Sequence, residues 1–274
     1  MLAAISRRVL VSSLLVYTSS VVRLGAVEPP TALSLLPDLE DGFRRLYLVR
    51  HGETAWNVAG RIQGKTDNPL NDNGRRQARL LADYLASEPL DVVASSTLQR
   101  AATTADAIAE RHATARRLRL ASFSEMCFGE YEGQEMSAVE LGYRDALKAW
   151  ASGDTDRTMP GKGGESPAMV AARGVEGLRS LGLVGESPTT ARRVCVVAHS
   201  RFNKILIASL QGDLSKASSV AQGNTCLNVL DVSPDGRCVV RAVNLREHLL
   251  PDGTAALRDP MALGVSRSRA GVAR

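Results

Sequence analysis

The sequence contains few cysteines, histidines and aromatic residues. Its 274 residues include four cysteines, four histidines and 4% aromatic residues. No CxxC or HExxH string occurs, and no cluster of carboxylates recurs at ligand spacing. The common zinc-site patterns are therefore absent, and we expect neither a metal nor another cofactor. A chain of this length needs no covalent cross-link, so we expect free thiols, with Cys195 buried in the apolar run 194–197.

The body of the chain also lacks an excess of positive charge. The formal charge is +5, from 34 basic and 29 acidic residues. Seven of the basic residues and one acid lie in 1–27 and 257–274, which leaves 27 basic against 28 acidic residues in between. The electrostatic pattern of a nucleic-acid-binding protein is absent, and we expect no nucleic acid as a partner.

The N-terminal segment, residues 1–27, has no acidic residue and no long uninterrupted apolar run. Arg7 and Arg8 precede an apolar stretch, 9–22, that is diluted by serine and threonine. This stretch is short and polar for a membrane-spanning helix. The pattern predicts a targeting segment, either a secretory signal cleaved near Gly25–Ala26 or a plastid or mitochondrial transit peptide. Without such targeting the protein would be cytoplasmic, and we expect no stable membrane association after processing.

The remainder divides into a linker, one domain and a tail. Residues 28–42 contain three prolines and end in Asp-Gly, which predicts a linker. We expect one domain over 43–250 and a loose C-terminal tail over 251–274, which shows no strong periodicity. Hydrophobic periodicity predicts the following elements: strands at 45–50, 90–95, 117–121, 193–198, 228–232 and 238–243, and helices at 74–87, 98–111, 137–151, 166–182 and 202–210.

The order of these elements predicts the fold class. Strands alternate with helices until a closing antiparallel pair, which is joined by the turn sequence Ser-Pro-Asp-Gly at 233–236. Ser96 or Thr97 is expected to cap the second helix. We therefore expect an α/β three-layer sandwich with a mixed, mostly parallel central sheet flanked by helices.

Two histidines stand directly after two apolar strands. Arg50-His51-Gly52 follows the run 46–49, and His199 follows the run 194–198. Open α/β sheets bind ligands at the carboxyl edge of their strands. A phosphate monoester is dianionic and needs fixed cations, and the planar fork of Arg50 suits its oxygens. We interpret His51 as a nucleophile whose other ring nitrogen a backbone carbonyl holds, and His199 as a second donor to the phosphoryl group.

The motifs around these residues resemble those of a known superfamily. The strings LVRHGETAWN, RIQGKTDNPLNDNGRRQA, SSTLQRAATTA, SEMCFGEYEG, GGES and VVAHS follow one another along the chain. In this order they resemble the histidine phosphatase (phosphoglycerate mutase-like) superfamily. The resemblance implies that Arg100 joins Arg50 in binding the phosphoryl group, with Asn57, Gln63 and Gly64 as further substrate-binding residues. Asn57 and Gln63 have an alternative role, which is to hold the loop.

The resemblance also implies a general acid. It places Glu125 in that role, where the residue would protonate the leaving oxygen. Glu53, Glu130 and Glu132 are the other candidates from the sequence, and Glu53 is the first alternative, although it could instead organise the loop after His51.

Three functions fit these residues. A hydrolase would pass the phosphoryl group from His51 to water, a mutase would return it to another hydroxyl of a phosphoglycerate, and a binding module would do neither. The superfamily's mutases typically carry a longer basic insertion than 131–165, which has few basic residues, so the hydrolase is favoured. We expect this region to form a lid, with Tyr143, Arg144 and Trp150 as candidate pocket residues. The expected partner is a small-molecule phosphomonoester, and a homodimer is left open.

Overall fold

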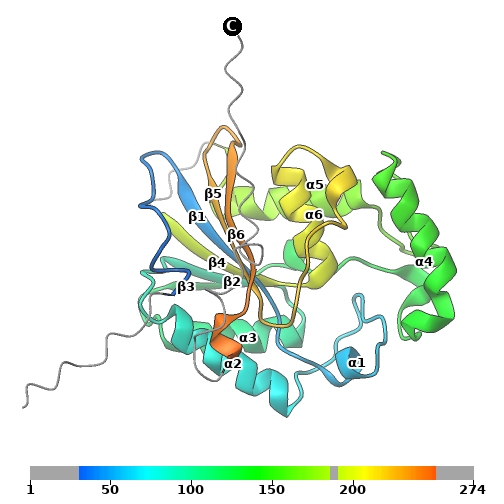
Figure 1. Ribbon diagram of the computed structural model, residues 1–274, viewed down its shortest axis with the longest axis horizontal. Coiled ribbons are helices and arrows are strands. Elements are labelled where there is room, and N and C mark those ends of the chain that lie inside the picture. Colours follow the sequence, from blue (N-terminus) through cyan, green and yellow to red (C-terminus); the bar gives the residue numbers. More distant parts are fainter. Residues whose placement is uncertain (1–30, 186–190, 251–274) are drawn as a thin grey trace, which may run out of the picture.

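The computed structural model describes residues 31–185 and 191–250, so the predicted targeting segment and C-terminal tail lie outside the described residues. Strands and helices alternate along this part of the chain (Figure 1). The strands are β1 (Arg44–Arg50), β2 (Val92–Ser95), β3 (Arg116–Arg119), β4 (Arg193–Ala198), β5 (Leu227–Val232) and β6 (Cys238–Leu245). The α-helices are α1 (Ala55–Val58), α2 (Asp72–Leu85), α3 (Gln99–Glu110), α4 (Met136–Ala151), α5 (Pro167–Ser180) and α6 (Ser200–Leu210). Short 3-10 helices lie at Ala121–Phe123, Gly129–Tyr131, Leu214–Lys216 and Glu247–Leu249.

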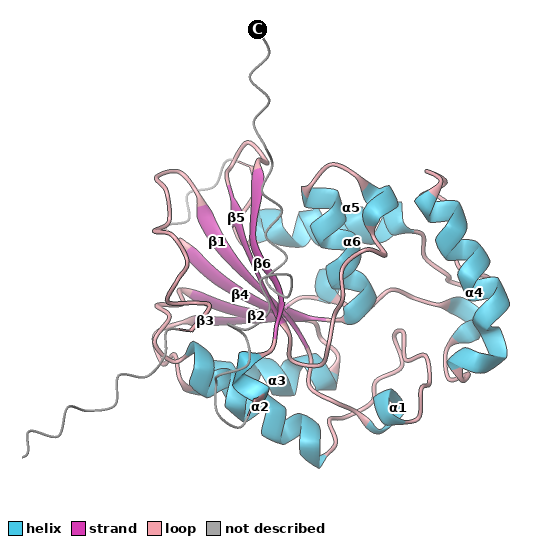
Figure 2. Cartoon of the chain, viewed as in Figure 1, coloured by secondary structure: helices cyan, strands magenta, loops and turns pink. Residues whose placement is uncertain are grey.

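The strands form one mixed sheet in the order β3-β2-β4-β1-β5-β6 (Figure 2). Strands β3, β2, β4 and β1 run parallel, whereas β5 is antiparallel to both β1 and β6. The turn at 233–236 joins β5 to β6, as its sequence predicts. The predicted mixed, mostly parallel sheet is therefore confirmed.

Alternate residues of the strands pack against different helices. In β1, Leu46 and Leu48 belong to the core that α5 and α6 cover, while Tyr47 and Val49 belong to the core under α2 and α3. This is the period of two that a strand buried on both faces requires. The sheet thus lies between two helical layers, and the predicted three-layer sandwich is confirmed. Helix α4 stands beside this body, farther from the sheet (Figure 1).

The caps of two helices show where local sequence rules hold and where they fail. Asn71 caps α2 by accepting a hydrogen bond from Gly74 N at 2.7 Å. The prediction that Ser96 or Thr97 caps α3 is wrong, because the residue before the helix is Leu98 and its side chain makes no cap bond. Asp67, from a distant loop, accepts from Gln99 N at 2.7 Å instead. A capping group that comes from another segment satisfies the same donor without leaving a local signal.

The described part of the segment predicted as a linker, 31–42, is irregular and packs on the domain. Leu33 is buried in the core beneath α2 and α3, and Ala32 N donates to Glu247 at 3.0 Å. All four cysteines are free, as expected, and Cys195 is fully buried. Over the described ranges, no helix is both long and apolar enough to cross a membrane.

Candidate active site

The two histidines meet because β1 and β4 are neighbours. These strands pair in parallel with Arg50 opposite Ala198, so the residues that follow them leave the same edge of the sheet together. The ring centroids of His51 and His199 lie 5.2 Å apart. The sequence places these histidines 148 positions apart, and the parallel register brings them into contact.

Hydrogen bonding fixes the tautomer of His51. Its Nδ1 lies 2.7 Å from the carbonyl oxygen of Gly52. A carbonyl only accepts, so Nδ1 carries the proton and Nε2 keeps its lone pair. Burial, followed by the charges of Arg100 and Arg50, holds the pKa of His51 well below its ordinary value of 6.5. The ring is therefore neutral near pH 7, with one nitrogen available for attack.

Position 52 accepts only glycine. A Cβ on Gly52 would lie 2.5 Å from the carbonyl oxygen of Gly74, at the start of α2. Gly52 N also donates to Thr104 on α3 at 3.0 Å. The turn after His51 is thus packed between two helices, which fixes the backbone carbonyl that orients the imidazole.

His199 lies at the same edge of the sheet as a buried ring. It is fully buried, and both Nδ1 and Nε2 lack a hydrogen-bond partner among the described residues. Burial, and then the charge of Arg100, lowers its pKa well below the ordinary value. A buried polar group without a partner costs free energy, so a ligand that supplies one gains affinity here.

Two arginines flank the histidines, each anchored on one side. Arg50 donates from Nη1 to Gln222 O at 2.7 Å, and Arg100 donates to Thr66 O and Gly64 O, both at 2.7 Å. The Nε atoms of both arginines are buried without a partner in the described part of the chain. Burial is the main cause that lowers the pKa of Arg100, to about 10. Two desolvated cations beside a neutral histidine favour the binding of an anion.

A small cavity of about 180 Å³ opens over these groups. It is lined by Arg50, His51, Asn57, Arg61, Ile62, Gln63, Gly64, Arg100, Glu125, Phe128, Met136, Tyr143, Ser200 and Arg201. Seven of the eight predicted site residues thus line one cavity, and the eighth, His199, packs against the ring of His51. Residues from the loop after β1, from α4 and from the start of α6 contribute to the wall.

The cavity distinguishes the four candidate glutamates. Glu125 is the only one of them in its wall. Glu53 accepts from the side chain of Asn71 at 2.8 Å and so organises the loop before α2. Glu132 accepts from the backbone amides of Lys65 and Phe128, which ties two loops together, and Glu130 is exposed.

The carboxylate of Glu125 is held by the first amides of α6. Its Oε1 accepts from Phe202 N and Met126 N, both at 2.9 Å, and its Oε2 accepts from Arg201 N at 3.2 Å. Arg173 of α5 supports the backbone, since it donates to the carbonyls of Ser124 and Glu125 at 2.7 and 3.1 Å. Three backbone amides, two of them at the start of α6, thus fix the position of the Glu125 carboxyl group.

The weaker predicted residues have mixed positions. Asn57 Oδ1 accepts from Thr54 N at 3.1 Å and from Asn224 Nδ2 at 3.2 Å, which are bonds that hold the loop. Gln63 Oε1 accepts from Thr54 Oγ1 at 3.1 Å. Gly64 has a φ of +52°, and its carbonyl anchors Arg100. The binding roles of Asn57, Gln63 and Gly64 remain predictions, although all three line the cavity.

The predicted pocket residues of α4 divide into three outcomes. Tyr143 lines the cavity, and Trp150 is a core residue whose indole N–H donates to Arg157 O at 2.8 Å. Arg144 does not line the cavity, because its side chain is 63% exposed and pairs with Glu140 one turn earlier. The buried face of α4 contains Val139, Ala146 and Trp150, and position 144 lies off that face.

The sequence interpretation did not identify Arg61 or Arg201 as site residues. Arg61 follows the loop after α1 and is half-exposed, whereas Arg201 is the second residue of α6 and is buried. The position of Arg201 two residues after His199 was the available signal. It was not specific, because a residue at a helix start can face either solvent or the site.

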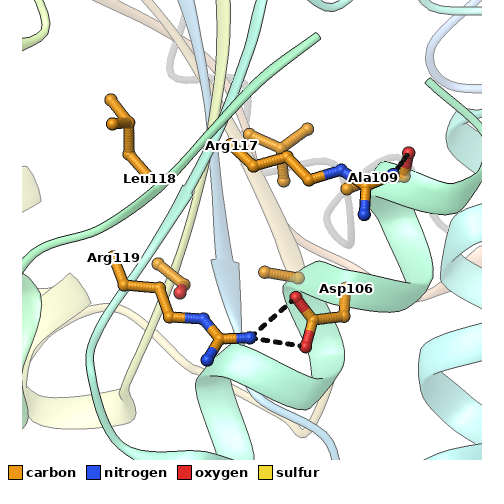
Figure 3. A pocket seen from close by; sticks show the side chains of 8 residues that line it. Asp106, Ala109, Arg117, Leu118 and Arg119 are labelled. Carbon is orange, nitrogen blue, oxygen red and sulfur yellow. Dashed lines mark hydrogen bonds and ion pairs between the residues drawn. The ribbon is translucent and has the colours of Figure 1, made fainter. Parts of the chain in front are cut away.

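A larger hollow elsewhere on the domain is also lined by arginines, but its arginines have other surroundings. It measures about 370 Å³ and lies between α3 and the edge strand β3 (Figure 3). Arg119 pairs there with Asp106 at 2.8 Å, and Arg117 donates to the backbone carbonyl of Ala109 at 2.8 Å. Among the described residues, buried arginine nitrogens without a partner occur at the smaller cavity and not at this hollow, which marks the smaller cavity as the anion site.

Comparison with known proteins agrees with this geometry. A model of the histidine phosphatase superfamily (branch 1) matches residues 46–245, and the chain belongs to this family. It is 32% identical over 221 residues to phosphoglycerate mutase-like protein 4 of Arabidopsis thaliana, covering 79% of this chain and 92% of that one. It is 33% identical over 209 residues to phosphoserine phosphatase 1 of Hydrogenobacter thermophilus, covering 75% and 94%.

A solved structure shows the same likeness in three dimensions. A mycobacterial glucosyl-3-phosphoglycerate phosphatase, in complex with VO3, superimposes with a TM-score of 0.63 at 29% identity, covering 74% of this chain and all of the other. The prediction of a histidine-type phosphatase is thereby confirmed at the level of the family. Within the ranges that the structure describes, no group of three or more histidine, cysteine, aspartate or glutamate residues is placed to hold a metal ion.

Proposed function

We propose that the protein hydrolyses small phosphate monoesters in two steps through a phosphohistidine on His51. One observation carries the proposal. His51 donates from Nδ1 to Gly52 O, which leaves Nε2 as a nucleophile in a cavity that also contains the unpartnered edges of Arg50 and Arg100. A neutral nucleophile beside desolvated cations suits attack on a dianionic phosphoryl group.

In the first step, Nε2 of His51 bonds to phosphorus and the bond from phosphorus to the leaving oxygen breaks. Arg50, Arg100 and His199 stabilise the charge on the phosphoryl oxygens. Glu125, the only candidate glutamate in the cavity wall, gives its proton to the leaving alcohol.

In the second step, water attacks the phosphohistidine. Glu125 is now ionised and takes a proton from the water as its oxygen bonds to phosphorus, and the bond from phosphorus to Nε2 breaks. Inorganic phosphate leaves, and both His51 and Glu125 return to their starting protonation states. The same carboxyl group thus serves as acid and then as base.

Hydrolysis is favoured over mutase activity by the position of the basic residues of α4. Arg144 and Lys148 are 63% and 77% exposed and pair with acids of their own helix. They therefore do not cover the cavity in a way that would keep water from the intermediate. Mutase activity remains the second candidate, because one relative is named a phosphoglycerate mutase-like protein.

The proposal is tested with the full-length protein and a panel of phosphomonoesters that includes phosphoserine, phosphosugars and 3-phosphoglycerate. Release of inorganic phosphate without an isomerised product supports hydrolysis. Isomerisation of 3-phosphoglycerate that depends on a bisphosphate primer would show a mutase instead. Retained activity in the presence of a chelator is also expected, and loss of activity that zinc or magnesium restores would contradict the phosphohistidine route.

We also propose that residues 1–27 direct the protein to an organelle or the secretory pathway. The support is the basic, acid-free start followed by a short apolar stretch. A fluorescent protein fused behind residues 1–42 should leave the cytosol, and a fusion with Arg7 and Arg8 replaced by glutamate should remain there. Light scattering of the purified protein tests the homodimer that the sequence leaves open.

A further inference from the structure

The cavity contains more positive charge than a phosphoryl group requires. Four arginines line it and one carboxylate does, that of Glu125. Arg50 and Arg100 serve the phosphoryl group in the proposed mechanism. Arg61 lies 3.9 Å from Glu135 and is half-exposed, so solvent and an acid already compensate its charge. Arg201 is the fourth, and its charge is the one that the described residues compensate least.

The described groups that accept hydrogen bonds from the guanidinium of Arg201 are neutral. The residue is 8% exposed, and its guanidinium lies 5.5 Å from the ring centroid of Tyr143 and 5.9 Å from that of Trp150. It donates to the Tyr143 hydroxyl and, at 3.2 Å, to Ser218 Oγ. In the described part of the chain, no carboxylate forms an ion pair with it. A buried cation without an anion is costly, and an anionic ligand that lies against it recovers that cost.

A second cation of α6 lies close to Arg201, outside the lining of the cavity. Lys204 lies one turn farther along α6 and is half-buried. Its ammonium group forms no ion pair in the ranges that the structure describes. Burial, and then the charge of Arg201, lowers its pKa to about 8. The start of α6 therefore presents two insufficiently compensated cations next to the proposed general acid.

We propose that Arg201 binds a carboxylate on the leaving-alcohol part of the substrate, and that the substrates are phosphate esters of small hydroxy acids. This inference rests on the proposed function, because it concerns the far end of the same substrate. A planar guanidinium matches a carboxylate with two parallel hydrogen bonds. Stacking against two rings holds the fork in place before the ligand arrives, which lowers the entropy cost of binding.

The names of two relatives agree with this chemistry. Phosphoserine and glucosyl-3-phosphoglycerate both carry a carboxylate in addition to the phosphate ester. The position of Arg201 beside Glu125 also fits, because the Arg201 amide and the Phe202 amide donate to that carboxylate. A group on the leaving alcohol would thus lie close to the residue that protonates the leaving oxygen.

The test compares two substrates that differ only at this point. 3-Phosphoglycerate and glycerol 3-phosphate share a three-carbon skeleton, but the first has a carboxylate where the second has a hydroxymethyl group. We expect the wild-type enzyme to prefer 3-phosphoglycerate. In Arg201→Met, kcat/KM for 3-phosphoglycerate should fall about 10- to 100-fold, which is the contribution expected of a charged hydrogen bond. For glycerol 3-phosphate, kcat/KM should change less than about threefold. The loss on 3-phosphoglycerate should appear mainly as a higher KM.

Further variants separate binding from folding. Arg201→Lys keeps the charge without the planar fork and should retain part of the preference. Tyr143→Phe removes one hydrogen bond to the guanidinium and should reduce the preference less than Arg201→Met does. Arg179→Met is the control, because Arg179 is an exposed arginine of α5 that pairs with Glu176. Melting temperatures and circular dichroism show whether each variant folds.

Each outcome decides between the alternatives. Equal losses on both substrates in Arg201→Met would assign Arg201 a structural role between α4 and α6 and overturn the inference. A wild-type enzyme without preference for 3-phosphoglycerate would overturn it as well, while hydrolysis of glycerol 3-phosphate would leave the proposed function intact. Absence of phosphate release from every ester of the panel, nitrophenyl phosphate included, would instead refute the proposed function.

Discussion

Replacing Glu125 by glutamine tests the proposed acid with little change of shape. Glutamine keeps one carbonyl oxygen, which can still accept from Met126 N and Phe202 N, the donors to Oε1. In the wild-type protein Arg201 N donates to Oε2, whereas in the variant it would face the amide group of glutamine, so one hydrogen bond is lost. We expect the free energy of unfolding to fall by about 1 to 3 kcal/mol, the cost of leaving one buried donor unsatisfied.

The effect on catalysis should depend on the leaving group. Glutamine has no proton to give, and a positioned general acid contributes about 10²- to 10⁴-fold. An alkyl alcohol leaves poorly without protonation, whereas nitrophenolate leaves as an anion. For Glu125→Gln we therefore expect kcat/KM to fall about 10²- to 10⁴-fold on an alkyl phosphate and less than about tenfold on nitrophenyl phosphate.

The assay separates the two steps. The parameter kcat/KM reports only the transfer to His51, so the leaving-group effect appears there. Hydrolysis of the phosphohistidine is common to all substrates and needs Glu125 as a base, so kcat should fall for both. Rapid mixing of the variant with nitrophenyl phosphate should give a burst of one nitrophenol per active site followed by slow turnover.

The matched control is Glu53→Gln. Its carboxylate bonds to Asn71 outside the cavity, so both substrates should be affected alike and weakly. Equal losses of kcat/KM on the two substrates in Glu125→Gln would refute the acid role. A larger leaving-group effect in Glu53→Gln would transfer the role to that residue.

Three further predictions concern charge, ligand and backbone. The folded pKa values of His51 and His199 lie below the ordinary 6.5, so the unfolded chain takes up protons first as the pH drops. The free energy of unfolding should therefore fall below pH 6.5, by up to about 1.4 kcal/mol per pH unit for each histidine. Urea unfolding at several pH values checks this, and an equal dependence on pH when both residues are asparagine would contradict it. Inorganic phosphate at about 100 times its Kd should add about 2.7 kcal/mol to the free energy of unfolding. The melting temperature should rise relative to sodium chloride of equal ionic strength, and an equal rise in Arg100→Leu would argue against the anion site. Gly64→Ala should lower kcat/KM about tenfold or more, because its Cβ would lie 2.0 Å from a carboxylate oxygen of Glu132 at a φ of +52°. Gly212→Ala is the control, because at a φ of +78° with no described atom within 4 Å it strains the backbone alone, and it should keep full activity.

The fold could be predicted from the sequence because its signals are local. Apolar runs that stop before Arg50 and His199 indicate buried strands, and the alternation with helices indicates the layers. The cap of α3 could not be predicted in this way, because its acceptor, Asp67, comes from a segment 32 positions before Gln99. A contact between segments so far apart cannot be inferred from the residues around the helix start.

Site residues that directly follow a strand could be predicted from the sequence. The general acid was harder to predict, because several glutamates lie at similar distances along the chain from the motifs. Glu53, Glu125 and Glu132 all stand near motifs, and only the folded chain shows which one reaches the cavity. Position 144 could have been rejected from periodicity alone, because the buried residues of α4 recur seven and four positions apart and exclude it. Arg201 could not be assigned without the rings that hold it, which come from another helix.

In the proposed mechanism the phosphoryl group passes through Nε2 of His51. The most direct test of this step is a rapid acid-free quench during turnover, followed by mass spectrometry of the peptide that contains residue 51. We expect one phosphoryl group per chain, stable to base and labile to acid, on His51 and absent in His51→Ala. A phosphoryl group on any other residue, or steady turnover in His51→Ala, would contradict it.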